Sequence, residues 1–329
     1  MLILSGKDIQ QHYRMGDAIA DVKQGLNSKK GGSITSPHRT VLDVPQHDGS
    51  ALYMPSADLA QEMASVKVVS IFPQNPAKGK PTTQGVLMLT EAETGEHICM
   101  MDASYLTRLR TGALSAIATE KLAREDAKVV GVIGTGAMAF EQVLGMLEVR
   151  NISSLKLYNR TKEKAEAFKK KLQDFGVEVD MDVCDHSEDV LAEADILCCA
   201  TRSKEPVFNG DLLKEGTHVN GVGSFLPSMR EVDQATIRRA EKIVVDDLAG
   251  VKDEAGELIH ADADEQFNWD FSSIDAELSD LGEDDRPLRE SKEGITFFKS
   301  VGAAYFDLVV AIGIYKKLKD MDIGVEAEL

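Results

Sequence analysis

Three cationic side chains in the first 110 residues are suited to bind a small anion. Lys67 lies in an otherwise apolar predicted strand, residues 63–72, and burying a lysine costs several kcal/mol unless an anion compensates its charge. Arg110 precedes a helical segment rich in Ala, Gly and Ser, which must pack closely against a neighbour, and Arg39 opens another strand. Together these residues predict a clamp for a small carboxylate, whereas Lys67 alone would also fit a sheet edge exposed to water.

A glycine motif supplies the second chemical signal. Gly134-x-Gly136-x-x-Ala139 follows the β-branched run at 128–133, so a strand, a tight turn and a helix start come in succession. The first glycine allows the turn, the second lets a pyrophosphate approach the backbone, and the small Ala139 permits close packing of helix and strand. The sequence therefore predicts a dinucleotide site, with these residues in contact with the cofactor: Gly134, Thr135, Gly136, Ala137 and Met138.

The end of the next strand indicates which dinucleotide is bound. An enzyme selective for NAD usually carries Asp or Glu here, to accept the ribose 2′-hydroxyl. This chain instead has Asn159, Arg160 and Thr161. A guanidinium pairs strongly with phosphate, and no carboxylate repels it. We expect NADP(H) as the preferred cofactor and NAD(H) as the second; the alternative is that Arg160 is only a solvated residue at a helix start.

The elements that position these residues form two groups, of which the larger begins at residue 128. Strand and helix patterns alternate from there, which is typical of a doubly wound parallel sheet. Since ligands lie at the carboxyl edge of such a sheet, Thr201, Val222 and Gly223 are expected near the nicotinamide. The fold class is α/β, a Rossmann-type doubly wound parallel sheet plus a mixed α+β domain. The predicted strands of the parallel sheet are 128–133, 154–158, 177–183, 194–199, 217–221 and 241–245.

The second group precedes the Rossmann-type domain. A long helix at 104–123 ends it, and the apolar C-terminal segment is expected to return to it as a packing helix. The domain prediction is therefore 1–122 together with 303–329 for substrate binding and dimerisation, and 123–302 for NAD(P) binding. The strands predicted in the first domain are 40–44, 51–54, 65–72, 86–90 and 97–101.

Composition excludes several classes of function. The 329 residues carry a formal net charge of −18, which argues against nucleic acid or an anionic membrane as a partner. No apolar run approaches the ~20 residues that span a bilayer, and the N-terminus lacks a secretory pattern. The four cysteines form no CxxC pair and the seven histidines have no ligand spacing, so no metal is expected. We predict a cytoplasmic protein.

The motifs together resemble the ornithine cyclodeaminase/mu-crystallin family over nearly the whole chain. Their order and spacing carry the resemblance, since single short motifs are weak evidence. The matching segments are 37–39, 66–73, 81–84, 109–116, the Gly134-x-Gly136 turn, 220–223 and 298–302.

The resemblance assigns expected roles to individual residues. It implies that Arg39, Lys67 and Arg110 bind the substrate carboxylate, with Lys67 and Arg110 as catalytic residues and Arg110 also near the cofactor. Thr82 would line the substrate and nicotinamide site, and Ser300 would contact the nicotinamide end. The resemblance also implies a homodimer built through the first domain and an active site between the domains.

One residue departs from the family pattern. Ornithine cyclodeaminases carry an aspartate after the Gly-Val-Gly segment, where it serves the amine chemistry, and Phe225 stands at the matching position here. A phenylalanine neither accepts a proton nor pairs with the distal ammonium of ornithine. The nearest carboxylates, Glu231 and Asp233, are expected on the following helix. We therefore expect Phe225 to cover the apolar side of a substrate ring.

The leading functional hypothesis is an NAD(P)H-dependent reductase of small cyclic ketimino acids. Such an enzyme converts pyrroline-2-carboxylate to proline or piperideine-2-carboxylate to pipecolate, and residues 159–161 look like the NADP-using, ketimine reductase branch of the family. Cyclodeamination of ornithine and an alanine or opine-type dehydrogenase are the enzymatic alternatives, because they need the same carboxylate clamp. A non-catalytic protein that binds a ligand together with NADP is the alternative from another class.

Overall fold

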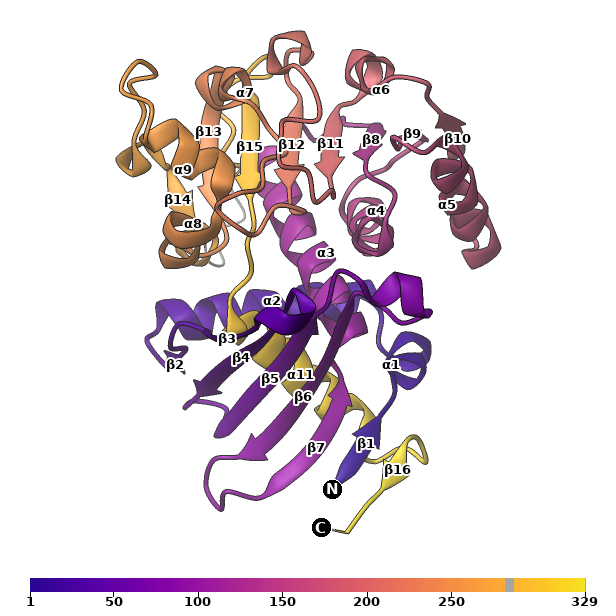
Figure 1. The fold of residues 1–329 in the computed structure, drawn as a ribbon, viewed down its shortest axis with the longest axis vertical. Coiled ribbons are helices and arrows are strands. Elements are labelled where there is room, and N and C mark those ends of the chain that lie inside the picture. The colour runs from indigo at the N-terminus through magenta and orange to yellow at the C-terminus, as the bar shows by residue number, and fades with distance from the viewer. Residues whose placement is uncertain (282–286, 329) are drawn as a thin grey trace. The chain divides into compact units, whose positions relative to one another are not determined.

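The structure, a computed structural model, describes residues 1–281 and 287–328. The chain divides into two compact units, Met1–Arg110 with Ala303–Leu329, and Thr111–Gly302. Each unit has its own sheet (Figure 1). The fold class predicted from the sequence is confirmed.

The two units meet in sequence inside helix α3 (Ala103–Leu122), and not after it as the sequence indicates. Packing explains this position. A Cβ atom added to Gly145 of the second unit would lie 2.6 Å from the carbonyl oxygen of Gly112, so helix α4 (Ala137–Val149) rests directly on the α3 backbone. The part of α3 after Arg110 therefore packs as part of the second unit.

The first unit is built on a mixed eight-stranded sheet. Its order is β16-β1-β7-β6-β5-β4-β2, and β3 also pairs with β4. The five predicted strands are present, and the middle ones are longer than predicted because backbone pairing continues beyond the apolar positions. The strands are β1 (Leu2–Leu4), β2 (Ile34–Thr35), β3 (Thr40–Val44), β4 (Gly49–Asp58), β5 (Met63–Ile71), β6 (Thr83–Glu91), β7 (His97–Asp102) and β16 (Val325–Glu326).

One face of this sheet is covered by α11 (Ala304–Leu318), which crosses β4, β5 and β6 (Figure 1). Helix α2 (Met15–Lys30) packs on α11, and a Cβ atom at Gly25 would lie only 2.5 Å from Val309 Cγ1. Helix α1 (Gly6–His12) follows β1. Although α11 is apolar, no helix in the described ranges is long and apolar enough to cross a membrane.

The other face of the sheet presents apolar side chains to solvent. Tyr53, Val68 and Val86 are cross-strand neighbours on β4, β5 and β6, and Tyr53 and Val86 are each 38% exposed. Leu42 on β3 is 53% exposed. Strand alternation explains why this face is separate from the one beneath α11, since successive side chains point to opposite faces.

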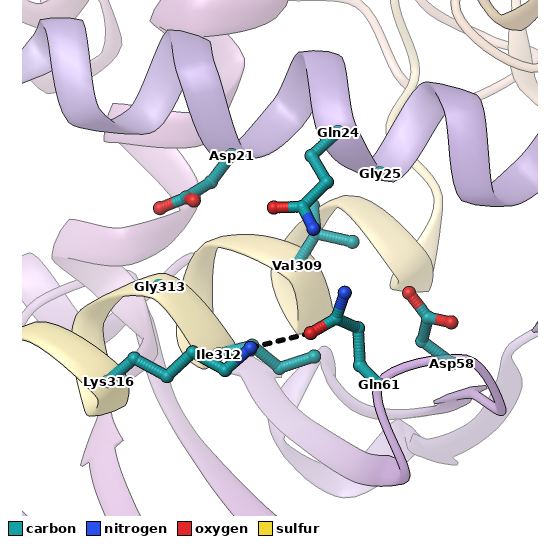
Figure 2. A pocket seen from close by; sticks show the side chains of 9 residues that line it. All are labelled: Asp21, Gln24, Gly25, Asp58, Gln61, Val309, Ile312, Gly313 and Lys316. Carbon is teal, nitrogen blue, oxygen red and sulfur yellow. Dashed lines mark hydrogen bonds between the residues drawn. The ribbon is translucent and has the colours of Figure 1, made fainter.

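A small pocket between α2, α11 and the end of β4 is structural (Figure 2). Its volume of about 30 Å³ holds little more than one water molecule and no substrate. Lys316 Nζ donates a hydrogen bond of 2.5 Å to Gln61 Oε1 across it.

The second unit contains an all-parallel sheet in the order β10-β9-β8-β11-β12-β15-β13-β14 (Figure 1). The six predicted strands are present, several with shorter bounds. The strands are β8 (Val129–Ile133), β9 (Ser154–Tyr158), β10 (Asp180–Val183), β11 (Ile196–Cys199), β12 (His218–Gly221), β13 (Ala240–Val245), β14 (Ala276–Glu277) and β15 (Ile295–Lys299), and the helices after α4 are α5 (Lys162–Phe175), α6 (Ser187–Glu193), α7 (Gln234–Arg239), α8 (Leu248–Glu254), α9 (Gly256–Asp262) and α10 (Leu278–Leu281).

Strand β15 is absent from the sequence prediction, although it is central in the sheet. It lies between β12 and β13, and all five of its residues are buried. The run Ile-Thr-Phe-Phe-Lys contains a polar and a charged residue, which a strand buried on both faces normally lacks. Lys299 is fully buried, so its charge must be compensated inside the unit.

Candidate functional site

The three elements of the first unit that cross at its core bring two cations onto one carboxylate. Lys67 points from β5 toward α11, where its Nζ lies 2.5 Å from Asp307 Oδ2. Arg110 on α3 reaches the other oxygen, with Nε 3.2 Å from Asp307 Oδ1. Thr107 Oγ1 lies 3.4 Å from Lys67 Nζ. The predicted carboxylate clamp therefore contains a carboxylate of its own, Asp307, which the sequence did not identify.

Burial and charge set the protonation of this cluster. Burial lowers the pKa of Lys67 to about 8, which the negative charge of Asp307 opposes and the positive charges of Arg110 and Arg39 reinforce. Burial raises the pKa of Asp307, but Lys67 and Arg110 outweigh it and hold that pKa below its usual value. Asp307 is therefore ionised at neutral pH. Lys67 is mostly protonated there and loses its proton as the pH rises through about 8.

The cluster has more positive than negative charge. Lys67 is 2% exposed, Arg110 is 5% exposed and Asp307 is fully buried, so one carboxylate faces two buried cations. In the part of the chain that the structure describes, Arg110 donates through Nε alone, which leaves its two Nη groups for a ligand. An anion is the group that this arrangement lacks, because buried charges are normally paired.

Arg39 and Thr82 lie in the same unit as the cluster. Arg39, just before β3, is half-buried and its charge acts on Lys67. The carbonyl of Thr82 accepts a 2.8 Å hydrogen bond from the Phe72 amide, which closes the loop between β5 and β6. Thr83, the next residue, pairs with Ile71, four residues along β5 from Lys67. Contacts of Arg39 and Thr82 with a substrate stay a prediction.

In the second unit, the glycine turn after β8 has the form that a pyrophosphate requires. Gly134 has φ +90°, and a Cβ atom there would lie 2.5 Å from Thr201 Cγ2. Gly136 is the N-cap of α4, and a Cβ atom there would meet nothing within 4 Å. Thr135 Oγ1 is buried and has no hydrogen-bond partner among the described residues. An open backbone, an unpaired hydroxyl and a helix N-terminus fit a dinucleotide phosphate.

Of the three residues after β9 that the sequence predicts at the cofactor, the first already bonds to the backbone of the protein. Asn159 Oδ1 accepts from the Thr135 amide at 3.3 Å, and its Nδ2 donates to the Thr161 carbonyl at 3.0 Å. Asn159 therefore ties the two turns together. Arg160 is exposed and makes no hydrogen bond or ion pair with the described residues. Arg160 is thus an exposed cation directly after β9, and its contact with a 2′-phosphate stays a prediction.

The remaining predicted residues lie at the carboxyl edge of the parallel sheet. Thr201 follows β11, and Val222 and Gly223 follow β12. The guanidinium of Arg202 lies 5.8 Å from the centre of the half-buried Phe225 ring. This edge also holds the buried carboxylates of Asp246, which the sequence does not single out, and Glu231, which it predicts on the following helix.

Ser300 lies at the same edge, after β15. Its hydroxyl donates to Asp246 Oδ2 at 2.7 Å, and the amides of Val301 and Gly302 donate to the same carboxylate. Burial raises the pKa of Asp246. The Ser300 hydroxyl is therefore held inside the unit, and its contact with a nicotinamide stays a prediction.

The two glycines give a matched test of the dinucleotide turn. Gly136→Ala introduces a methyl group that meets no protein atom, so we expect the free energy of unfolding to change by less than about 1 kcal/mol while NADPH affinity falls at least about tenfold. Gly134→Ala should weaken both, because its φ is positive and Thr201 obstructs it. Chemical denaturation and cofactor titration measure the two effects, and unchanged affinity in Gly136→Ala would contradict the assignment.

Comparison with known proteins identifies the family of the chain. The model of the ornithine cyclodeaminase/mu-crystallin family matches residues 1–322. A Delta(1)-pyrroline-2-carboxylate reductase of Bacillus cereus is 37% identical over 329 residues, covering 100% of both chains. The solved Thermococcus litoralis Delta(1)-pyrroline-2-carboxylate reductase, in complex with NADH and L-proline, has a TM-score of 0.94 and 34% identity, covering 99% of this chain and 100% of its own.

A second solved structure, an archaeal alanine dehydrogenase dimer with bound NAD, has a TM-score of 0.90 and 30% identity, covering 100% of this chain and 99% of its own. The resemblance that the motifs carry is confirmed: the chain belongs to the ornithine cyclodeaminase/mu-crystallin family.

Proposed function

We propose that this protein reduces small cyclic ketimino acids with NAD(P)H, and that pyrroline-2-carboxylate is converted to proline. The observation that carries the proposal is the excess of buried positive charge at Lys67, Arg110 and Asp307. A carboxylate group of a small substrate supplies the missing anion. The names of the Bacillus and Thermococcus relatives support the same substrate class.

The clamp residues hold the substrate and its proton. Arg110, through its Nη groups, and Arg39 bind the substrate carboxylate, and Lys67 shares that charge. Asp307 keeps Lys67 Nζ in one position and favours its protonated form, so a proton stands ready beside the imine. Bound NAD(P)H supplies the hydride for the imine carbon. A protonated imine is already electrophilic, so the protein acts mostly by positioning and by anion binding.

Phe225 favours ketimine reduction over cyclodeamination. Cyclodeamination of ornithine needs a group that handles the distal amine, and the resemblance to the family matches the half-buried Phe225 to the position of its aspartate. A ring substrate without a distal ammonium is compatible with this apolar surface. Alanine dehydrogenation needs the same carboxylate clamp, and the archaeal relative carries that name.

Turnover separates these activities. We expect rapid oxidation of NADPH with pyrroline-2-carboxylate or piperideine-2-carboxylate, and slower reaction with pyruvate plus ammonia. Lys67→Met should lower kcat/KM for the imine by about 10²–10⁴-fold with NADPH affinity unchanged, because it removes the cation and the proton donor. Proline and ammonia formed from ornithine with no net change in the cofactor would overturn the proposal. An unaltered NADPH-linked signal in Lys67→Met would favour a binding protein.

The pH dependence should follow Lys67. Its pKa is lowered to about 8 by burial, so the ammonium is charged below that pH and loses its proton above it. We expect kcat/KM for reduction to fall as the pH rises through about 8, because the neutral amine neither attracts the carboxylate nor donates a proton. Lys67→Arg keeps its charge over this range and should lack this decline. A decline that persists in Lys67→Arg belongs to another group.

Arg160 makes the cofactor preference testable. We propose that NADP(H) is preferred over NAD(H), because Arg160 is exposed, carries no acidic partner among the described residues and follows β9 directly. Arg160→Gln should raise KM for NADPH about 10–100-fold and change KM for NADH less than about threefold. Lys162→Gln is the control, since Lys162 begins α5 and pairs with Asp185 at 2.5 Å. If the two substitutions raise KM for NADPH equally, Arg160 is not the residue that recognises the 2′-phosphate.

We also propose that the apolar outer face of the first sheet pairs with a second copy of this chain. Tyr53, Val68 and Val86 form a row across three strands there, and such contiguous exposed apolar side chains mark interfaces. Val86→Asp should convert a dimer to monomers in sedimentation equilibrium. Leu212→Asp, at a 51% exposed leucine of the second unit, should leave the dimer intact. A dimer that survives Val86→Asp is formed through another surface.

A further inference from the structure

The carboxyl edge of the parallel sheet contains a buried carboxylate that joins two loops. Glu231 is fully buried, and it lies in the loop before α7, not on that helix as the sequence indicates. Its Oε1 accepts from the amide of Thr201 at 2.5 Å and from the Thr201 hydroxyl at 2.8 Å. Its Oε2 accepts from the amides of Gly223 at 2.6 Å and Ser224 at 3.1 Å. One side chain thus binds the loops after β11 and β12 simultaneously.

The two loops are also in direct contact. A Cβ atom at Gly223 would lie 2.1 Å from the Thr201 carbonyl oxygen and 2.6 Å from Glu231 Oε1, so only glycine fits. Four donors on one carboxylate satisfy it as an ionised group. The carboxylate therefore helps to set the spacing of the loops, together with the backbone hydrogen bonds from the Arg230 amide to the Ser203 carbonyl at 2.9 Å and from the Val207 amide to the Glu231 carbonyl at 3.0 Å.

A buried ion pair supports the same loop from the other side. Lys299, at the end of β15, places Nζ 2.7 Å from the Ser224 carbonyl oxygen, 2.5 Å from Ser224 Oγ and 3.0 Å from Glu257 Oε1. The Ser224 hydroxyl in turn donates to Glu257 at 2.9 Å. Lys299 is fully buried and Glu257 is 2% exposed. This network explains why a lysine stands in a strand that is buried on both faces.

The position of these groups gives them a role. Strands β11 and β12 follow β8 in the sheet order, on the side opposite β9, and a dinucleotide lies across the carboxyl ends of such strands. In the proposed binding mode Gly136 faces the pyrophosphate, and Arg160 lies on the adenosine side. The loops after β11 and β12, which carry Thr201 and Phe225, lie on the nicotinamide side.

We propose that Glu231 is a positioning residue, which acts together with the Lys299–Glu257 pair through Ser224. Its carboxylate holds the loops after β11 and β12 at the spacing that seats the nicotinamide half of the cofactor. Glu231 contacts neither the substrate nor the cofactor itself. The inference rests on the proposed function in one respect, because it takes the bound molecule to be a nicotinamide dinucleotide.

A pair of ligands isolates the nicotinamide half. NADPH and 2′-phospho-ADP-ribose differ only in the nicotinamide, and NADH with ADP-ribose is the corresponding pair if the wild type binds NADH more tightly. In Glu231→Gln one carboxylate oxygen is replaced by an amide NH₂. The NH₂ group cannot accept from the N–H groups of the loop that it faces, so that loop loses its contact with residue 231. We expect the Kd of the cofactor to rise about tenfold or more and the Kd of the fragment to change less than about twofold, both measured by calorimetric titration.

Controls make the outcome unambiguous. Glu193→Gln makes the same chemical change at a carboxylate of α6 that is 55% exposed and pairs with Lys156, outside both loops, and it should alter neither Kd. Ser224→Ala, which removes the hydroxyl between Lys299 and Glu257, is the second variant in case Glu231→Gln does not fold. It should raise the Kd of the cofactor about threefold and leave that of the fragment unchanged. Equal losses for both ligands, or no loss for either, would overturn the positioning role.

The proposed function is tested separately by turnover of the wild type. If NADPH oxidation with pyrroline-2-carboxylate is absent but Glu231→Gln still separates the cofactor from its fragment, the proposed substrate fails and the positioning role stands. If the wild type turns over pyrroline-2-carboxylate but Glu231→Gln changes the Kd of the cofactor and of the fragment equally, the proposed function stands and the positioning role fails.

Discussion

The buried cluster of Lys67, Asp307 and Arg110 is the interaction on which the first unit depends. A lysine in the middle of a sheet is unfavourable unless its charge is compensated, and the compensation comes from α11, which lies across β4, β5 and β6. The helix is therefore held both by apolar packing and by an ion pair at its first turn. Because one carboxylate faces two cations, the compensation is incomplete, and the cluster keeps a net positive charge.

The second unit also contains a buried lysine, but there the buried carboxylates outnumber it. Lys299 also stands in a strand and is also fully buried, but Glu257 pairs with it directly. Glu231 lies in the loop after β12, the loop that Lys299 contacts through Ser224. Here carboxylates outnumber the cation, and their remaining acceptor capacity is filled by backbone amides and hydroxyls. The cluster of the first unit is left with a net positive charge, whereas the buried charges of the second unit are satisfied by groups that join its loops.

Sequence reasoning recovered what local patterns determine. The glycine turn, the parallel strands and the exposed Arg160 after β9 follow from residue type and near-neighbour spacing, and Lys67 stood out because it interrupts an apolar run. Asp307 was missed because it lies in an apolar helix and acquires its meaning only from a contact 240 residues away. The burial of Glu231 and the presence of β15 could not be predicted for the same reason. Glu231 and Lys299 are charged, charged residues are normally exposed, and only their partners in the fold explain their burial.

The order in which the chain is made bears on the first unit. The second unit is one continuous stretch, Thr111–Gly302, whereas the first needs both ends of the chain, Met1–Arg110 and Ala303–Leu329. During synthesis on a ribosome, which proceeds from the N-terminus, β5 emerges long before α11. Until the last residues emerge, the inner face of the sheet lacks its covering helix and Lys67 lacks its carboxylate. The cluster of Lys67, Arg110 and Asp307 is therefore among the last features of the nascent protein to form, and a chain released early lacks it.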